Sequence, residues 1–426
     1  MKTRADFAKQ EVIRFPESLL ANNFEDILFN YFKGMKNSVD QILLDLRHCK
    51  FIDFVVFQYL ISLFCFRRKR NQKTYFGIPV EKKVRDFIRV WEFPNAFSNA
   101  TELKFSDFIV EEDKKFIGEK QTTFKGFGDV VDTLEYNLDW KSGHRGKQNF
   151  FSYNTYYLKR KEMASILPEK VPSVEGRRWN EGLILKVLEK QLKSDNAKEE
   201  VGRIIIYESM SNAVRHPDAT VIQAVSKFDH GLFSIKDKRN LRICIWDDGK
   251  SIVETLKPLI QEGKPIRSVI LPLYMSDQIF LKIEDLEYKE NNREMQIDQS
   301  DNPDKNAIDE IILQSSLFPG ISRTVSESIP DVEPFDGEQS RKIGNELYRD
   351  KQGMGLYALM RAVLDIFQGS LFIRSGNLFM SMKVAHDAYR KQHNVRYKTK
   401  IVRYPQWYPT FVGNLLIIAL PLKGIK

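Results

Sequence analysis

The 426-residue sequence lacks the marks of several protein classes. It has no run of about eighteen apolar residues, so no membrane-spanning helix is expected. Residues 1–14 mix charges of both signs without an apolar block, so no secretory signal is expected. Its three cysteines, Cys49, Cys65 and Cys244, are far apart and show no zinc-ligand spacing. This pattern is typical of a cytoplasmic protein without disulfides.

The composition predicts a folded chain of two or three domains. Apolar residues make up 42% and charged residues 29%, which excludes wholesale disorder. The net charge is +9, although residues 253–352 hold 20 acidic and only 12 basic residues. The rest of the chain is therefore basic. Such a charge is as typical of solvated lysine-rich helices as of a protein that binds an anionic partner. No base-reading motif accompanies it, so binding to nucleic acid is a third and least favoured function.

Residues 1–104 alternate strand-like and helix-like patterns, which is typical of a compact α/β unit. Expected strands are Val12–Phe15, Gln41–Leu46 and Thr74–Ile78, and expected helices are Phe24–Met35, Val55–Phe66 and Glu81–Trp91. The helix over Val55–Phe66 is apolar nearly all round, which predicts burial. Pro94 is expected to end the third helix.

Residues 105–171 have no sustained period and are interpreted as a connector, and a second α/β unit is expected over 172–426. Within it, residues 253–352 are interpreted as a lid insertion because so long a stretch inside a domain is usually functional or mobile. The expected elements are a helix over Lys198–His216, strands over Ala219–Phe228 and Leu241–Trp246, a helix over Lys351–Phe367, a hairpin of Ser370–Ile373 with Phe379–Val384, and a last strand over Leu415–Leu420.

Glu208 and Asn212 lie four residues apart, so a helix places them on one face. The amide oxygen of Asn212 suits Mg²⁺, which prefers oxygen ligands, and the carboxylate of Glu208 suits orienting a nucleophile. A solvated helix face would show the same two residues.

Two glycine motifs follow. Asp247-Asp248-Gly249 comes after an apolar strand, where a carboxylate can accept a hydrogen bond from an exocyclic amine. An ordinary Asp-Gly turn has the same sequence. Gly353-Met354-Gly355 opens a helix whose N–H groups suit phosphate oxygens. Lys351 and nearby cations suit the terminal phosphate or are plain surface charges.

The order of these motifs resembles the GHKL (Bergerat-fold) ATP-binding family, which includes gyrase and the histidine kinases, over Trp179–Lys426. The resemblance implies ATP and Mg²⁺ as cofactors in an α/β sandwich. It implies that Glu208 is the catalytic carboxylate and that Asn212 is the Mg²⁺ ligand. His216 matches a position that is often His in the anti-sigma-factor kinase branch.

The same resemblance makes Asp247 the adenine-reading residue with Gly249 as its partner, and makes Gly353 and Gly355 the lid glycines. Gly413 and Asn414 match a Gly-Thr pair before the last strand. Two positions depart from the family: Ser251 stands where a second glycine is usual, and Asn414 replaces the threonine that supports the adenine-reading Asp.

Residues Val12–Phe97 are similar to STAS (anti-sigma-factor antagonist) domains. The resemblance depends on Ile42-Leu-Leu-Asp-Leu, on Cys49-Lys-Phe-Ile-Asp53 and on the apolar helix that follows. In that family a serine in the helix start accepts phosphate. Here the run is Asp53-Phe54-Val55-Val56, and Val55 has no hydroxyl. The resemblance therefore implies a docking or dimerisation module that is not phosphorylated at that position.

Together these features predict an ATP-binding regulatory protein. It would hydrolyse ATP slowly or transfer the γ-phosphate to a partner protein, as a kinase of the anti-sigma-factor type would, with the nucleotide setting the state of the lid. A P-loop site is excluded because no Gly-x-x-x-x-Gly-Lys-Ser/Thr motif occurs. The alternative is a non-enzymatic nucleotide-bound scaffold that forms homo-oligomers through the STAS-like domain.

Overall fold

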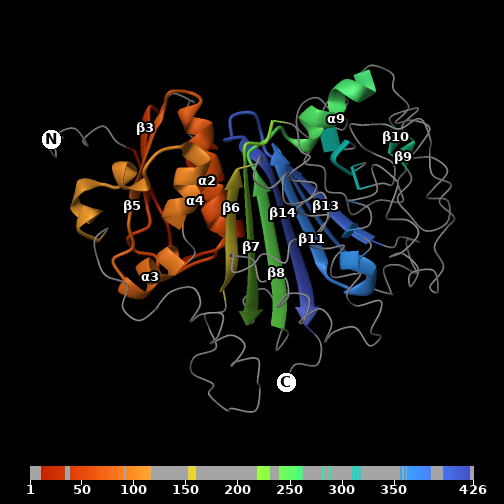
Figure 1. Ribbon diagram of the computed structural model, residues 1–426. Coiled ribbons are helices and arrows are strands. Elements are labelled where there is room, and N and C mark those ends of the chain that lie inside the picture. The colour runs from red at the N-terminus through yellow and green to blue at the C-terminus, as the bar shows by residue number, and fades with distance from the viewer. Residues whose placement is uncertain are drawn as a thin grey trace, which may run out of the picture.

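The protein contains both helices and strands, which confirms the α/β prediction (Figure 1). The assignment of its parts to STAS and GHKL folds stays a prediction. Among the described residues no helix is long and apolar enough to cross a membrane. The computed structural model describes residues 11–33, 39–90, 93–116, 152–159, 218–230, 239–261, 281–282, 287–288, 309–310, 312–314, 316–317, 356, 359–360, 362–384 and 397–422.

A parallel three-stranded sheet, in the order β1-β3-β5, forms the centre of the first unit, residues 11–116. Its strands match the three expected ones to within a residue or two. They are β1 (Glu11–Arg14), β3 (Gln41–Asp45) and β5 (Lys73–Gly77). The unit also contains a short parallel pair, β2 (Ser18–Leu19) and β4 (Phe51–Ile52), and the helices α1 (Ala21–Lys33), α2 (Val55–Arg68), α3 (Lys82–Val90), α4 (Phe93–Thr101), η2 (Phe105–Phe108) and η3 (Glu111–Phe116).

Helix α2 is buried nearly all round, as its apolar sequence predicts. Arg67 and Arg68 lie in its last turn, where cations complement the negative end of the helix dipole. Pro94 was predicted to end the preceding helix, but it lies in the first turn of α4, a position where its missing N–H costs nothing.

Residues 105–116, placed in the expected connector, pack onto the first unit. The buried carboxylate of Asp113 accepts hydrogen bonds from the backbone N–H of Ile78 at 2.9 Å and from Arg47 Nε at 3.0 Å. A second piece of the connector, β6 (Ser152–Lys159), pairs instead with a strand of the second unit.

An antiparallel seven-stranded sheet, in the order β13-β12-β11-β14-β8-β7-β6, forms the second unit and is called the large sheet below. The predicted hairpin is confirmed as β11 and β12. Besides β6, its strands are β7 (Val221–His230), β8 (Arg239–Asp247), β11 (Ser370–Gly376), β12 (Leu378–Val384), β13 (Tyr397–Arg403) and β14 (Phe411–Leu422). Helices α9 (Ile252–Gln261) and η7 (Ala362–Ile366) and the small pair β9 (Leu281–Lys282) with β10 (Glu287–Tyr288) complete the described elements.

The two faces of the large sheet have different neighbours, because successive residues of a strand point to opposite faces. One face packs on α2 and α4, which lie between the two sheets (Figure 1). Cys244 and Trp246 of β8 and Leu415 and Ile417 of β14 belong to this shared core. The opposite face is contacted by η7 and, at β11, by α9.

A buried ion pair joins the first unit to the large sheet. Arg242 of β8 donates from Nη1 to Asp53 Oδ2 at 2.8 Å and from Nη2 to Asp53 Oδ1 at 3.0 Å, and Asp53 is fully buried. The same guanidinium lies 4.6 Å from the centroid of the Phe54 ring. The start of α2 is therefore bound to the large sheet.

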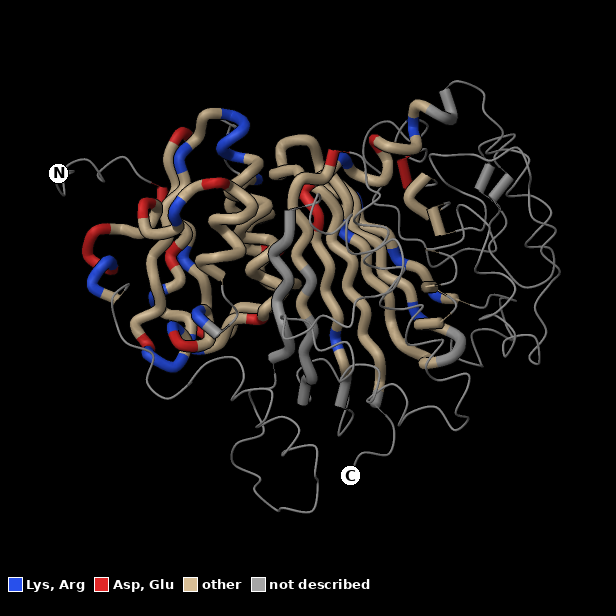
Figure 2. The backbone as a smooth tube through the Cα atoms, in the orientation of Figure 1, with Lys and Arg blue, Asp and Glu red and all other residues tan. Residues whose placement is uncertain are grey.

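A second buried pair lies nearby. Arg374 of β11 donates from Nε to Glu25 Oε1 of α1 at 2.9 Å, and Tyr408 Oη donates to the other carboxylate oxygen at 2.5 Å. Arg374 is 1% exposed. In Figure 2 the described strands of the large sheet carry few charges, whereas charges are frequent in the first unit. Arg242 and Arg374, both buried in the large sheet, are thus each matched by a carboxylate of the first unit.

We expect Arg242→Met to lower the free energy of unfolding by about 3–5 kcal/mol, because it leaves the Asp53 carboxylate buried without its partner. Lys250→Met is the matched control. It breaks the pair between Lys250 and Asp218, whose side chains are 58% and 63% exposed, and should cost less than about 1 kcal/mol. Urea titration of both variants measures the difference. Equal losses would show that the buried pair does not hold the two units together.

Candidate functional site

Asp247 is the last residue of β8 and lies on the face of the large sheet opposite to the first unit. It is 4% exposed, and its Oδ1 accepts hydrogen bonds from the backbone N–H of Gly249 at 3.0 Å and from Asn414 Nδ2 at 3.2 Å. Asn414 is its register partner on β14. The structure therefore brings three of the predicted site residues, Asp247, Gly249 and Asn414, into contact.

Asn414 is held from a third strand. Ser375 Oγ of β11 donates to Asn414 Oδ1 at 2.6 Å, and the backbone N–H of Ile252 donates to the same oxygen at 3.0 Å. Asn414 Nδ2 also donates to the backbone carbonyl of Lys250 at 2.9 Å. We call Asp247, Asn414 and Ser375 the Asp247 cluster. Its hydrogen bonds connect the ends of β8, β11 and β14 with the first residue of α9.

Ser251, which departs from the GHKL pattern, has a structural role at the start of α9. The backbone N–H of Glu254 donates to Ser251 Oγ at 3.1 Å, and the backbone N–H of Ser251 donates to Glu254 Oε2 at 2.8 Å. This reciprocal arrangement is a capping box, which satisfies two N–H groups at a helix N-terminus. The Ser-x-x-Glu spacing is the local sequence signal of this cap, whereas Ser251 was expected only to replace a glycine of the GHKL motif.

Gly413 lies inside β14, which begins at Phe411 and therefore before the predicted start at Leu415. The register between β11 and β14 shifts after Ser375, and Gly413 takes a left-handed φ of +80° in this irregularity. A Cβ atom at Gly413 would lie 1.6 Å from the carbonyl oxygen of Asp247. Only glycine permits the backbone of β14 to approach Asp247 this closely.

Asp248 has a different role from its neighbour. Its carboxylate accepts hydrogen bonds from the backbone N–H groups of Thr220 at 2.7 Å and Val221 at 2.8 Å, and from Thr220 Oγ1 at 2.5 Å. These contacts hold the start of β7 against the end of β8. Asp247 is thereby left as the buried carboxyl group of the motif.

Burial raises the pKa of Asp247 from 3.8 to about 8, while the hydrogen bonds from Gly249 and Asn414 act in the opposite direction. At neutral pH the group is therefore largely protonated. It offers one O–H donor and one acceptor oxygen. That pair complements a ligand edge with an acceptor beside an N–H donor, which is the pattern of N1 and N6 in adenine.

The remaining predicted site residues, Glu208, Asn212, His216, Lys351, Gly353 and Gly355, lie outside the described residues. Among the residues that the structure describes, no group of three or more His, Cys, Asp or Glu side chains could hold a metal ion. Ser375 was not anticipated, and no local pattern marks it, because its role arises from pairing between β11 and β14.

We expect Gly413→Ala to destabilise the protein strongly or prevent folding, because the new Cβ would overlap the backbone at Asp247. Gly376→Ala is the control. Gly376 also has a positive φ, +56°, but its Cβ would meet only the Ser251 side chain at 3.2 Å. Its cost should stay near about 1–2 kcal/mol. Thermal unfolding of both variants tests which substitution costs more stability. A smaller loss at position 413 would contradict the close approach of Gly413 to the Asp247 carbonyl.

The raised pKa predicts a pH effect on stability. Between about pH 4 and pH 8 the folded protein holds a proton on Asp247 that the unfolded chain releases, so this group's contribution to stability falls as the pH rises. Asp247→Asn does not titrate. Its free energy of unfolding should therefore rise relative to wild type by about 1.4 kcal/mol per pH unit up to pH 8 and then level off. Urea titrations at several pH values measure this, and a pH-independent difference would exclude a protonated Asp247.

In comparisons with known proteins, no family model, no curated protein and no solved structure matches the chain. The likeness to GHKL and STAS proteins therefore depends on the sequence motifs and stays a prediction. What the described residues add is the geometry around Asp247.

Proposed function

We propose that the protein is an ATP-binding regulatory protein in which Asp247 recognises the adenine ring. The observation that carries this proposal is the Asp247 cluster: a buried carboxyl group at the end of a central strand, supported from the last strand by Asn414. The sequence motif alone is more typical of an ordinary Asp-Gly turn. The burial of Asp247 favours a recognition group, because turn aspartates are normally solvated.

The surroundings of Asp247 agree with a planar ligand. Gly249 has no side chain to block a base from the backbone beside the carboxyl group. Replacement of the family's threonine by Asn414 keeps a polar donor on Asp247, at 3.2 Å. The departure at Ser251 serves the cap of α9 and does not remove the Asp247 contacts.

The chemical step is proposed for residues outside the described part of the chain. Asn212 would hold Mg²⁺, and Glu208 would orient a water molecule or a partner's hydroxyl group for attack on the γ-phosphate. The N–H groups of Gly353 and Gly355, with the cation of Lys351, would hold the phosphates. The outcome would be slow hydrolysis or transfer to a partner protein.

The alternative is a nucleotide-bound scaffold without turnover. The buried pairs Asp53–Arg242 and Glu25–Arg374 favour it, because they fix the STAS-like unit on the large sheet rather than leave it as a detachable substrate. Val55 also offers no hydroxyl for phosphate. Oligomerisation through this unit is part of the alternative and would have to use a surface away from the start of α2.

We expect isothermal titration calorimetry of the full chain with Mg²⁺-ATP to show saturable binding to wild type, and Asp247→Ala to weaken it at least tenfold, about 1.4 kcal/mol, because alanine has neither the donor nor the acceptor. Asp107→Ala is the matched control. It makes the same truncation at an exposed position of the first unit and should bind as wild type does. No heat of binding to wild type, or equal binding by both variants, would contradict the proposal.

Phosphate release then separates the two functions. Glu208→Ala should keep nucleotide binding and lose turnover if the protein is an ATPase or kinase. Binding without phosphate release or phosphotransfer in wild type would favour the scaffold.

A further inference from the structure

The side-chain amide of Asn414 bonds both to the Asp247 carboxyl group and to the backbone that leads into α9. Its Nδ2 donates to the carbonyl of Lys250 at 2.9 Å, and to Asp247 Oδ1 and Oδ2 at 3.2 and 3.4 Å. Its Oδ1 accepts from the backbone N–H of Ile252, the first residue of α9, at 3.0 Å. One planar amide, in a residue that is 7% exposed, therefore connects the carboxyl group to the helix.

Ser375 strengthens this connection. The backbone N–H of Ile252 also donates to Ser375 Oγ at 2.8 Å, and Ser375 Oγ donates in turn to Asn414 Oδ1 at 2.6 Å. The amide oxygen therefore faces donors and the amide nitrogen faces acceptors, so a reversed amide would set like groups against each other. Because the oxygen and the nitrogen of an amide move together, a shift of Ile252 also moves the donor that Asp247 receives.

Helix α9 is held by further contacts that involve neither Asp247 nor Asn414. The capping box of Ser251 and Glu254 fixes the point where the helix begins. Further along, Lys257 Nζ pairs with Asp309 Oδ1 at 2.9 Å. The position of α9 can therefore be changed through contacts outside the Asp247 cluster.

We propose that Asn414 is a positioning residue through which α9 regulates base recognition at Asp247. With α9 in place, the amide holds the carboxyl group in its binding orientation. When the start of α9 is displaced, the amide loses its partners at Lys250 and Ile252, and the affinity for the nucleotide falls. This inference rests on the proposed function, because it concerns the same adenine site.

Ser251→Ala tests the coupling, because it removes the cap of α9 and leaves the three side chains of the Asp247 cluster intact. We expect the backbone N–H of Ile252 to exchange with solvent at least about fivefold faster, as measured by mass spectrometry on peptides that contain it. We expect Mg²⁺-ATP to bind at least about threefold more weakly in calorimetry of the full chain.

Asn23→Ala is the matched control for a weakened helix start. Asn23 Oδ1 accepts a hydrogen bond from the backbone N–H of Leu20 at 2.7 Å, at the beginning of α1 in the first unit. This is the same kind of contact as the one that Glu254 makes with Ser251. The control should leave the exchange at Ile252 and the affinity for ATP as they are in wild type.

A second measurement needs no nucleotide. Burial raises the pKa of Asp247, the hydrogen bond from Asn414 lowers it, and the charge of Asp248 raises it. The pKa should therefore rise further in Asn414→Ala. In that background the free energy of unfolding gained by Asp247→Asn should keep rising above pH 8 instead of levelling off there, which a merely structural role of Asn414 would not produce.

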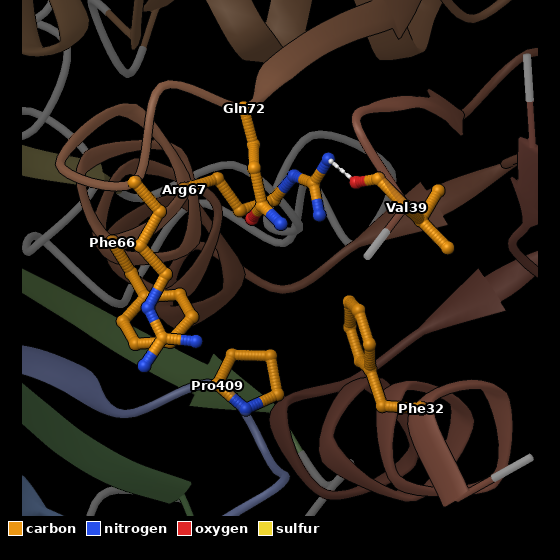
Figure 3. Close-up of a pocket in the computed structure, with 7 residues that line it drawn as sticks. Phe32, Val39, Phe66, Arg67, Gln72 and Pro409 are labelled. Atoms are coloured by element: carbon orange, nitrogen blue, oxygen red, sulfur yellow. Dashed lines mark hydrogen bonds between the residues drawn. The ribbon is translucent and has the colours of Figure 1, made fainter. Parts of the chain in front are cut away.

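Arg67→Met is the control for this second measurement. Arg67 is also buried and also donates to backbone carbonyl groups, those of Val39 at 2.9 Å and Lys73 at 3.1 Å (Figure 3). The pocket beside it has a volume of about 10 Å³, which is the space of one water molecule. Its loss should lower stability and leave the levelling near pH 8 unchanged.

Four results separate the outcomes. Binding of ATP to wild type that Ser251→Ala leaves unchanged, or equal losses in Ser251→Ala and Asn23→Ala, would overturn the inference and leave the adenine site standing. A levelling at pH 8 that persists in Asn414→Ala would do the same. No binding of ATP to wild type would overturn the proposed function and this inference with it. If Asn414→Ala does not fold, Ser251→Ala decides alone.

Discussion

Helix α2 is the element on which the rest of the structure depends, because it is buried against two sheets at once. Its apolar surface packs on β5 of the first unit and on β14 of the large sheet. A charge buried in such a position needs polar partners, and the pair Asp53–Arg242 at the start of the helix meets this condition. The helix thereby fixes the two units as neighbours in one common core.

Successive side chains of β8 point to opposite faces of the large sheet, so this one strand has two roles. Arg242, Cys244 and Trp246 point to the first unit, whereas Asp247 points to the opposite face, where it meets Asn414. The strand that anchors the first unit therefore also carries the proposed adenine-reading residue. The first residues of β14 also contact the first unit: Ser62 Oγ of α2 accepts a hydrogen bond from the backbone N–H of Val412 at 2.7 Å, one residue before Gly413.

Much of the described fold was predictable from local patterns. The period of two in the strands and the apolar character of Val55–Phe66 are properties of short stretches, and the structure confirms them. The motif order also selected Asp247, Gly249 and Asn414, which the structure brings into contact. Helix α4 was missed because its proline was interpreted as the end of a helix. Strand β13 was missed because the polar stretch Tyr397–Arg403 has only a weak strand pattern.

By itself the sequence determined most of the described strands and the buried helix α2, since period and side-chain type act over a few residues. Only the tertiary structure decided which charges meet. Asp53 and Arg242 are 189 residues apart, and Glu25 and Arg374 are 349 apart, so no local period relates them. Their pairing follows from the docking of one sheet on another, where buried charges must find partners wherever the packed surfaces bring them together.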